Sequence, residues 1–201
     1  MAKFEKSQQI VGINEGGYQC DPRDEGNYYM GNLIGTNWGI SAPTLAGFLG
    51  RVPTKQDMQN LTRQTAESIL KINFWLKNNF DKIRNQSIAT LIYDGAVNHG
   101  TNGMRFLMEK ALRIMGYELS YYAVFQATNI EFLNRLNQKK LFYTIKTVRQ
   151  EKYKASSESW AVKGHLNRLE RIEYYPDNTL SGVWPYMALV LLGTGVLFIA
   201  V

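Results

Sequence analysis

The residues with the clearest chemical potential lie near the N-terminus, where one glutamate stands directly before two glycines. Glu15 precedes Gly16 and Gly17 at the end of a short amphipathic run. Because glycine readily ends a helix, we expect Glu15 at a helix C-terminus, facing the negative end of the helix dipole. That position, together with partial burial, favours the protonated carboxyl group. A glutamic acid that keeps its proton at neutral pH can act as a general acid.

The segment after Glu15 supplies polar side chains that could hold a water molecule or stabilise positive charge opposite it. These side chains are Asp21, Asp24, Glu25, Thr36 and Asn37. One acid at a helix end, facing a polar hairpin, is an arrangement that can cleave a glycosidic bond. On these residues alone, a glutamate that simply ends a helix is the plainer alternative.

The elements that must position these residues are a first helix and a small β region. Apolar spacing predicts a helix over residues 3–14. Residues 18–41 are rich in glycine, asparagine and aspartate, which is too much turn chemistry for a long helix. We expect short strands around 28–30 and 37–40, forming a hairpin or an irregular flap.

The rest of the chain up to residue 172 has a helical pattern. Thr54 is a candidate N-cap, and Thr128 with Glu131 fits a capping box at the start of a long helix. The pattern predicts helices over residues 54–76, 86–97, 103–115, 128–154 and 156–172. No period of 20 to 50 residues repeats.

Composition limits the partners and the stabilising chemistry. The net charge is +6 with a sequence pI near 9.3, and basic residues outnumber acidic ones between 135 and 171. Such a surface favours an anionic partner. The single cysteine, Cys20, excludes an intrachain disulfide, and two histidines cannot supply a recognisable zinc site. No helix-turn-helix pattern accompanies the charge, so we expect no nucleic acid partner.

The C-terminal end differs from the rest of the chain. Residues 178–201 carry no charged side chain, and residues 184–201 are almost wholly apolar. A helix of that length spans roughly 27 Å, close to the roughly 30 Å hydrocarbon core of a bilayer. A buried terminal helix is the alternative, but a chain of this size has little room to cover it. We therefore predict a transmembrane tail, and charges in the N-terminal apolar runs argue against a secretory signal.

Several sequence stretches resemble the motifs of glycoside hydrolase family 108, which comprises peptidoglycan-cleaving muramidases of lysozyme-like fold. "NEGGYQCDPRDEG" and "GTNWGIS" resemble the family's N-terminal signature. "YDGAVNHG", "RQEKY" and "SWAVKGHLNRLERI" resemble later motifs in the same order. The resemblance covers about residues 3–173.

The resemblance implies roles for individual residues. Glu15 matches the catalytic acid, and Asp24 and Thr36 fall where related lysozymes position the attacking water. The stretch "NYYMGNLIG" lengthens the flap relative to the family pattern, so Asp21 is a substitute for Asp24. The expected substrate-binding residues are Tyr18, Asp21, Asn37, Trp38 and Asn98. No metal and no organic cofactor is implied.

The expected fold is mainly α, a lysozyme-like helical domain with a small β flap and a C-terminal transmembrane helix. We predict a catalytic unit over residues 1–95, a helical peptidoglycan-binding annex over 96–175, a linker over 176–183 and the membrane tail over 184–201.

The predicted function is hydrolysis of the β-1,4 bond between N-acetylmuramic acid and N-acetylglucosamine. The partners expected are peptidoglycan, the membrane through the tail, and a holin-like release partner. The soluble domain would stay on the cytoplasmic side until release, as in phage-type lysis, or the protein would be an exported cell-wall remodeller. The alternative is a wall-binding or membrane-linked scaffold that has the same fold without the chemistry.

Overall fold

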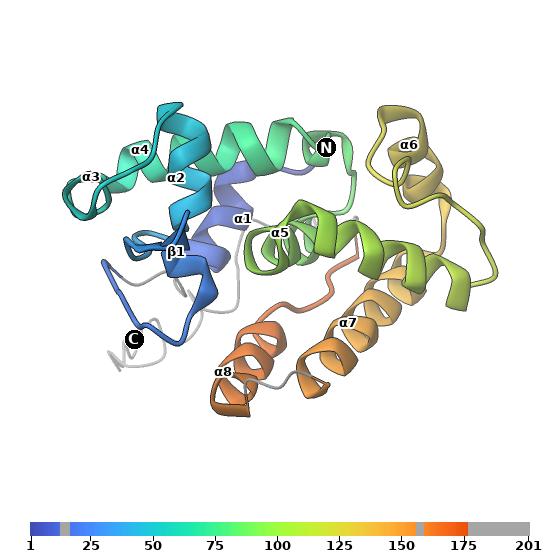
Figure 1. Ribbon diagram of the computed structural model, residues 1–201. Helices are drawn as coiled ribbons and strands as arrows, with labels where there is room; N and C mark the ends of the chain where they lie inside the picture. The colour runs from blue at the N-terminus through green and yellow to red at the C-terminus, as the bar shows by residue number, and fades with distance from the viewer. Residues whose placement is uncertain (13–16, 156–158, 177–201) are drawn as a thin grey trace, which may run out of the picture.

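The computed structural model describes residues 1–12, 17–155 and 159–176. Helices surround α5 (Gln86–Ile114), which runs through the middle of the molecule (Figure 1). α1 (Phe4–Val11) packs against α5 on one side, α7 (Gln138–Lys154) packs against it on another, and α8 (Ser159–Glu170) packs against α7. The predicted mainly helical fold with a small β element is confirmed.

Two hydrogen bonds fix the register between α1 and α5. The Ser7 and Thr90 hydroxyl groups are 2.8 Å apart, and the Tyr93 hydroxyl donates to the Gln8 side-chain oxygen at 2.6 Å. Because the partners advance together along both helices, α1 and α5 run in the same direction. The C-terminal end of α1 at Val11 therefore lies beside the turn of α5 that follows Tyr93.

An aromatic cluster anchors this pair of helices. Phe4, Trp75 and Tyr93 pack edge to face, with ring centroids 5.6 to 5.8 Å apart, and Phe80 packs edge to face against Trp75 at 6.2 Å. Trp75 comes from the π-helix η3 (Lys71–Leu76), and Phe80 opens the short helix η4 (Phe80–Lys82). Buried aromatic pairs of this geometry stabilise the fold beyond the area they bury.

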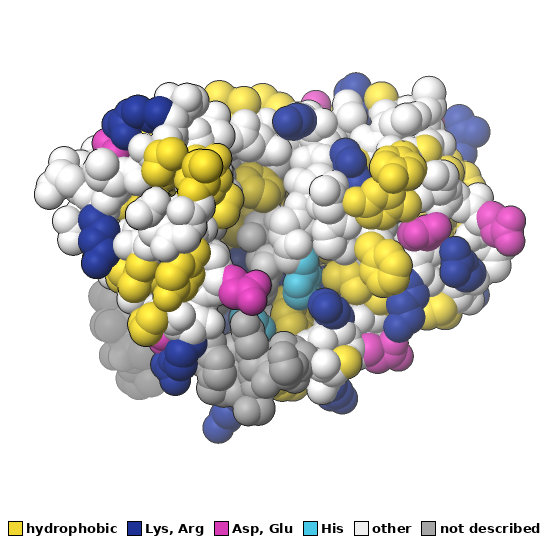
Figure 2. Space-filling view, in the orientation of Figure 1, with side chains coloured by type: hydrophobic (Ala, Val, Ile, Leu, Met, Phe, Trp, Pro, Cys, Tyr) yellow, Lys and Arg dark blue, Asp and Glu magenta, His cyan; other side chains and the backbone are white. Residues whose placement is uncertain are grey.

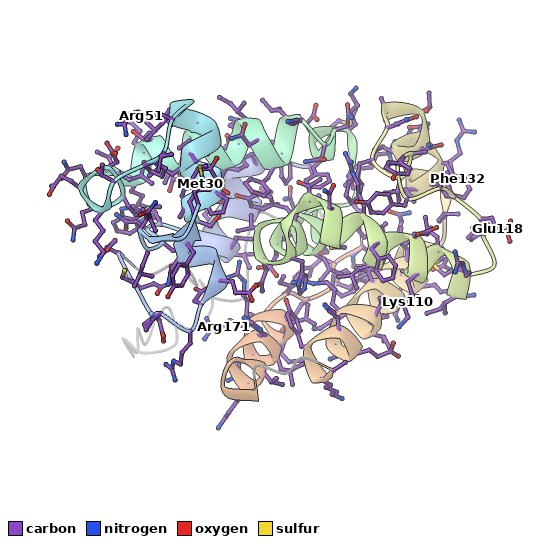
Figure 3. The ribbon with its side chains drawn as sticks, in the orientation of Figure 1. Met30, Arg51, Lys110, Glu118, Phe132 and Arg171 are labelled. Atoms are coloured by element: carbon purple, nitrogen blue, oxygen red, sulfur yellow. The ribbon has the colours of Figure 1, made fainter. Side chains whose placement is uncertain are left out.

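The β region is smaller than expected. β1 (Tyr28–Tyr29) pairs with β2 (Asn32–Leu33), and 3₁₀-helix η2 (Glu25–Asn27) precedes them. Met30 and Gly31 form the turn, both with positive φ, which suits the right-handed twist of a tight hairpin. Figure 3 labels Met30 here, beside α2 (Ala42–Leu49), a helix not predicted from the sequence.

Of the two expected forms, the structure has the irregular flap, because residues 28–30 do not pair with residues 37–40. Asn37 instead forms an isolated bridge with Ile40 across the two-residue turn of Trp38 and Gly39, both with positive φ. Each half of the flap thus closes on itself through its own tight turn, because both turns place a glycine where the left-handed conformation is needed.

Two predicted helices are each divided in the structure. Residues 54–76 form α3 (Lys55–Gln59) and α4 (Arg63–Leu70), which continues into η3; the Thr54 cap is confirmed, and Thr62 caps α4. Residues 128–154 form α6 (Ala127–Arg135) and α7. The capping box at Thr128 is wrong, because Gln126 occupies the N-cap and Glu131 forms an ion pair with Arg84 at 2.6 Å.

α5 contains the break that the sequence predicts between its two halves. Gly100 has φ 70° and ψ 159°, which is not helical, while the residues on both sides are. The predicted boundary between residues 95 and 96 falls inside the first half of this helix. Lys110, in the second half, pairs with Glu151 of α7 at 2.8 Å (Figure 3).

The predicted linker and tail cannot be placed on this fold. Residues 177–201, and with them the predicted transmembrane segment 184–201, lie outside the described residues. Within the described ranges, none of the helices has the length and apolar character needed to cross a bilayer.

Candidate active site

The candidate site is built from three segments: the end of α1, the flap and the residues of α5 before its break. Glu15 lies outside the described residues, but the chain on either side of it is described up to Gly12 and again from Gly17. Figure 2 shows this face of the molecule hollowed in its middle, between the N-terminal elements and α5. Histidine and acidic side chains lie at the lower end of that hollow.

Gln19 organises the polar side of the flap. Its backbone exchanges two hydrogen bonds of 2.8 Å with Thr36. Its side-chain nitrogen donates to Asp24 at 3.0 Å, and the buried Asn27 amide donates back to its side-chain oxygen at 2.9 Å. Thr36 and Asp24, which are separated by eleven other residues, are therefore held beside the same glutamine.

The lengthened part of the flap does not separate these two residues. The Asn27 carbonyl accepts from Ile34 N–H at 2.8 Å and from Gly35 N–H at 3.0 Å. This closes the loop, so residues 28–33 form a hairpin outside the polar cluster.

Tyr18 packs tightly over Gly35 and fixes this crossing of the chain. Gly35 has φ 99°, and a Cβ there would lie 2.6 Å from both the Gln19 carbonyl oxygen and the Tyr18 ring. The Tyr18 hydroxyl donates to Ile34 O at 3.1 Å. A hydrogen bond with Cys20, together with burial, raises the pKa of Tyr18 to about 12. Tyr18 therefore stays neutral and supports the flap.

The three candidate partners of Glu15 differ in the hydrogen bonds and ion pairs that they already form. Asp21 forms an ion pair with Arg23 at 2.6 Å, and the guanidinium lowers the Asp21 pKa to about 2. Asp24 accepts from Gly26 N–H at 2.9 Å and from Gln19, so it caps η2. The Thr36 hydroxyl has no hydrogen-bond partner among the described residues.

The structure places the two predicted binding residues of the second turn differently. Asn37 is 3% exposed, and its amide donates to Met58 O at 2.8 Å, which ties the flap to α3. Trp38 is half-buried, has φ 50° and lies with its ring 6.0 Å from the Arg63 guanidinium. A positive φ is rare for so bulky a residue and costs of order 1–3 kcal/mol, which is typical of functional positions.

Asn98 lies on α5, two residues before the break at Gly100. Its side-chain nitrogen donates to the Tyr153 hydroxyl oxygen at 2.9 Å. Its side-chain oxygen has no hydrogen-bond partner within the described part of the chain. Asn98 comes four residues after Asp94 and therefore lies on the face of α5 that packs against α7.

A buried ionic network lies beneath Asn98. Asp94 accepts from Arg149 at 2.7 Å and from Arg168 at 2.6 Å, and both Asp94 and Arg149 are fully buried. Burial acts to raise the Asp94 pKa, but the two guanidiniums outweigh it and hold the pKa below its ordinary value. Asp94 lies on an apolar helix face, so the sequence indicates that it needs a partner if it is buried, but it did not identify Arg149 and Arg168 as the partners.

His99 belongs to the same buried region. Its ring lies 4.9 Å from the Tyr153 ring, and His165 lies 4.9 Å from the other side of the same ring. Burial, followed by the nearby Arg149 charge, lowers the His99 pKa to about 3. His99 is therefore neutral at physiological pH, and its half-buried ring packs against Tyr153.

A separate pocket lies on the second half of α5 and contains none of the predicted site residues. Its volume is about 440 Å³, and it is lined by Phe106, Glu109, Lys110, Arg113 and Ile114. Glu109, the only carboxylate in that lining, already pairs with Arg113 at 3.3 Å. The flap and the end of the first half of α5 therefore remain the better candidate site.

Comparison with known families indicates the class of protein that the chain resembles. Residues 8–100 match the family Glycosyl hydrolase 108. This segment is therefore similar to that family. The match contains Glu15, the Gln19 cluster and Asn98, whereas α7 and α8 follow it in the sequence. None of the curated proteins matches the chain.

A solved structure extends the likeness beyond the family match. The structure of SagA from Brucella abortus superposes with a TM-score of 0.70 at 25% sequence identity. The alignment covers 84% of this chain and 90% of that one. The glycoside hydrolase prediction is thus confirmed at the level of the family, and the likeness includes helices that follow residue 100.

Proposed function

We propose that this protein is a muramidase that hydrolyses the β-1,4 bond between N-acetylmuramic acid and N-acetylglucosamine in peptidoglycan. The observation that carries the proposal is the glycosyl hydrolase 108 match over residues 8–100, which contains Glu15 and the polar flap. Peptidoglycan is the substrate class that the family suggests.

Glu15 acts in this proposal as the general acid that protonates the leaving oxygen. A second group must then orient water or stabilise the oxocarbenium-like transition state. Thr36 is best suited, because its hydroxyl is uncommitted, whereas Asp24 braces the flap through Gln19 and Asp21 is paired with Arg23. Asp24 serves as a positioning residue for the same cluster.

Substrate contacts follow from the exposed groups around the flap. The Trp38 indole can stack against a sugar face, and the Asn98 side-chain oxygen can accept a hydrogen bond from a sugar hydroxyl or amide. The basic surface between residues 135 and 171 would attract the anionic cell wall, and this attraction should weaken as salt is added.

Clearing of purified peptidoglycan tests the function directly. The native protein is expected to lower the turbidity, and Glu15→Gln is expected to slow clearing by about 10²–10⁴-fold, the usual contribution of general acid catalysis. Glu118→Gln, an exposed glutamate that follows α5 and lies outside the flap, is the matched control and should behave as the native protein does. No clearing by the native protein would favour the inactive wall-binding scaffold; equal clearing by Glu15→Gln would remove the role of Glu15.

We also propose that residues 184–201 hold the protein at a membrane until a holin-like partner releases it. The uncharged apolar run supports this proposal. The expected result is that the full chain sediments with membranes, and that truncation after Pro176 makes it soluble. In intact spheroplasts, cleavage of the hydrolase domain by added protease would contradict a cytoplasmic location.

A further inference from the structure

We propose that Arg105, in the second half of α5, is the centre of a binding site for an oxyanion, either a carboxylate or a phosphate group. The site lies where the turn after η3 contacts α5, and it contains none of the site residues predicted from the sequence. The inference goes beyond the proposed function, because anion binding is measured without turnover.

Arg105 has no carboxylate partner among the described residues. Glu109, one turn further along α5, pairs instead with Arg113 at 3.3 Å. Within the described part of the chain, the Arg105 guanidinium makes one hydrogen bond, from Nη2 to the Asn78 side-chain oxygen, and at 3.4 Å that bond is long. Most of its N–H groups are therefore unused.

The burial of Arg105 makes this lack of partners costly. The residue is half-buried, and its Nε atom is buried without a hydrogen-bond partner. Buried donors are normally bonded, and one that is not requires a partner such as a water molecule or an ion. The guanidinium also keeps its charge at physiological pH. An anion would satisfy both the buried donor and the charge.

Two other guanidiniums that have a buried, unbonded nitrogen differ from Arg105. Arg149 and Arg168 each have such a nitrogen, but both already pair with Asp94. Their charges are therefore compensated within the fold. The charge of Arg105 is not compensated by any described residue, which identifies it as the place for an external anion.

A second unpaired donor lies beside Arg105. Thr101 precedes Arg105 by four residues, so both side chains lie on one face of α5. The Asn78 amide contacts both, because its nitrogen donates to the Thr101 hydroxyl oxygen at 3.4 Å while its oxygen accepts from Arg105. The Thr101 hydroxyl proton has no acceptor among the described residues. The two side chains can therefore donate together to one ligand.

Asn78 gives this pair of donors a fixed reference point. It is 2% exposed, and its side-chain nitrogen also donates to the Phe74 carbonyl at 2.8 Å. Arg105 and Thr101 are thus arranged around a side chain that is itself held by the backbone. Groups arranged in advance lose little conformational entropy when they bind a ligand.

The chemistry of the donors defines the class of ligand. Arginine binds carboxylates and phosphates through two parallel N–H···O bonds, and a hydroxyl adds a third donor. Both groups occur in bacterial cell walls, since the peptide stems of peptidoglycan carry carboxylates and wall-linked polymers carry phosphates.

An NMR titration of the full chain in an uncharged detergent tests the site. Inorganic phosphate is expected to shift the Nε–H signal of Arg105 and the side-chain amide signals of Asn78. Arg105→Gln should weaken phosphate binding by about tenfold or more, as loss of charge-assisted hydrogen bonds does. Arg105→Lys should restore part of the affinity, because lysine keeps the charge and the alkyl stem but not the planar fork.

Lys110→Gln is the matched control, since it removes one exposed positive charge from the same half of α5. It should leave phosphate affinity unchanged. An equal loss in Lys110→Gln and Arg105→Gln would show a general attraction of charge and would overturn the site. Native affinity in Arg105→Gln, or an unshifted Arg105 signal in the native protein, would overturn it as well.

Two further probes distinguish the sources of the anion. One is a soluble peptidoglycan fragment with free stem carboxylates, and the other is the same fragment with those carboxylates amidated. Displacement of phosphate by the first fragment alone supports the stem peptide as the source, whereas displacement by neither supports a wall phosphate. A protein that fails to clear peptidoglycan can still bind the anion, so this proposal and the muramidase proposal fail independently.

Discussion

The flap and the interface of α5 with α7 and α8 both contain many polar side chains. In the flap these side chains bond near neighbours in the sequence, whereas at the interface they bond distant residues. In the flap, the bonds between two side chains join residues two to eight apart in sequence, such as Arg23 to Asp21 and Asn27 to Gln19. At the interface, Asp94 bonds residues 55 and 74 positions away. Arg23 of the flap is exposed and its partner Asp21 is half-buried, whereas Asp94 and Arg149 of the network are fully buried.

This difference separates the part of the molecule that can exchange partners from the part that cannot. Exposed ion pairs contribute little to stability, because water competes for both charges. Breaking a buried pair leaves a charge without solvent and is strongly destabilising. Polar groups of the flap can therefore exchange bound water for substrate, while the buried network holds α5, α7 and Asn98 in place.

The largest effect is expected when the buried network is broken. Asp94→Asn leaves Arg149 and Arg168 without their shared carboxylate and should lower the free energy of unfolding by about 3–5 kcal/mol. The control is Glu151→Gln, which removes an exposed ion pair with Lys110 and should cost no more than about 1 kcal/mol. Denaturant unfolding measures both, and equal losses would contradict the contrast between the two regions.

A smaller effect is expected when the uncommitted hydroxyl of the flap is removed. Thr36→Val keeps the shape of the side chain and should lower kcat about tenfold, with the unfolding midpoint unchanged, if the hydroxyl orients the attacking water. Asp21→Asn removes only the pairing with Arg23 and should leave kcat unaltered. The reverse pattern would identify Asp21 as the group opposite Glu15.

A third effect is a pH dependence at His99. Its folded pKa of about 3 lies below the ordinary value of about 6.5, so the unfolded state binds more protons between these pH values. The associated stability is fully present above pH 6.5 and is lost as the pH falls toward 3, by at most about 1.4 kcal/mol per unit. His99→Phe keeps a ring against Tyr153 and removes this titration.

Unfolding measured between pH 7.5 and 4.5 isolates the contribution of His99. Asp94 also has a lowered pKa, but its contribution is lost only below its ordinary value near 3.8. The native protein should therefore lose more stability than His99→Phe across this interval. Parallel curves for the two proteins would show that His99 titrates normally.

Local sequence chemistry determined several features without help from the rest of the fold. Glycine and asparagine predicted the turns of the flap, and apolar spacing predicted α1 and the two halves of α5. The Thr54 cap followed from the same rules, because a cap depends on neighbours only three residues away. The motifs around Glu15 and Asn98 lie within the segment that matches family 108.

The tertiary structure alone decided which distant groups meet. Helical periodicity identifies an apolar face, but it does not say which helix covers that face. The sequence therefore singled out Asn98 without its contact to Tyr153, and the capping pattern at Thr128 without the Arg84 partner that Glu131 takes instead. The structure was likewise needed to show that Asp21 pairs with Arg23 and that Asp24 bonds Gln19. It also showed that the Thr36 hydroxyl has no partner among the described residues.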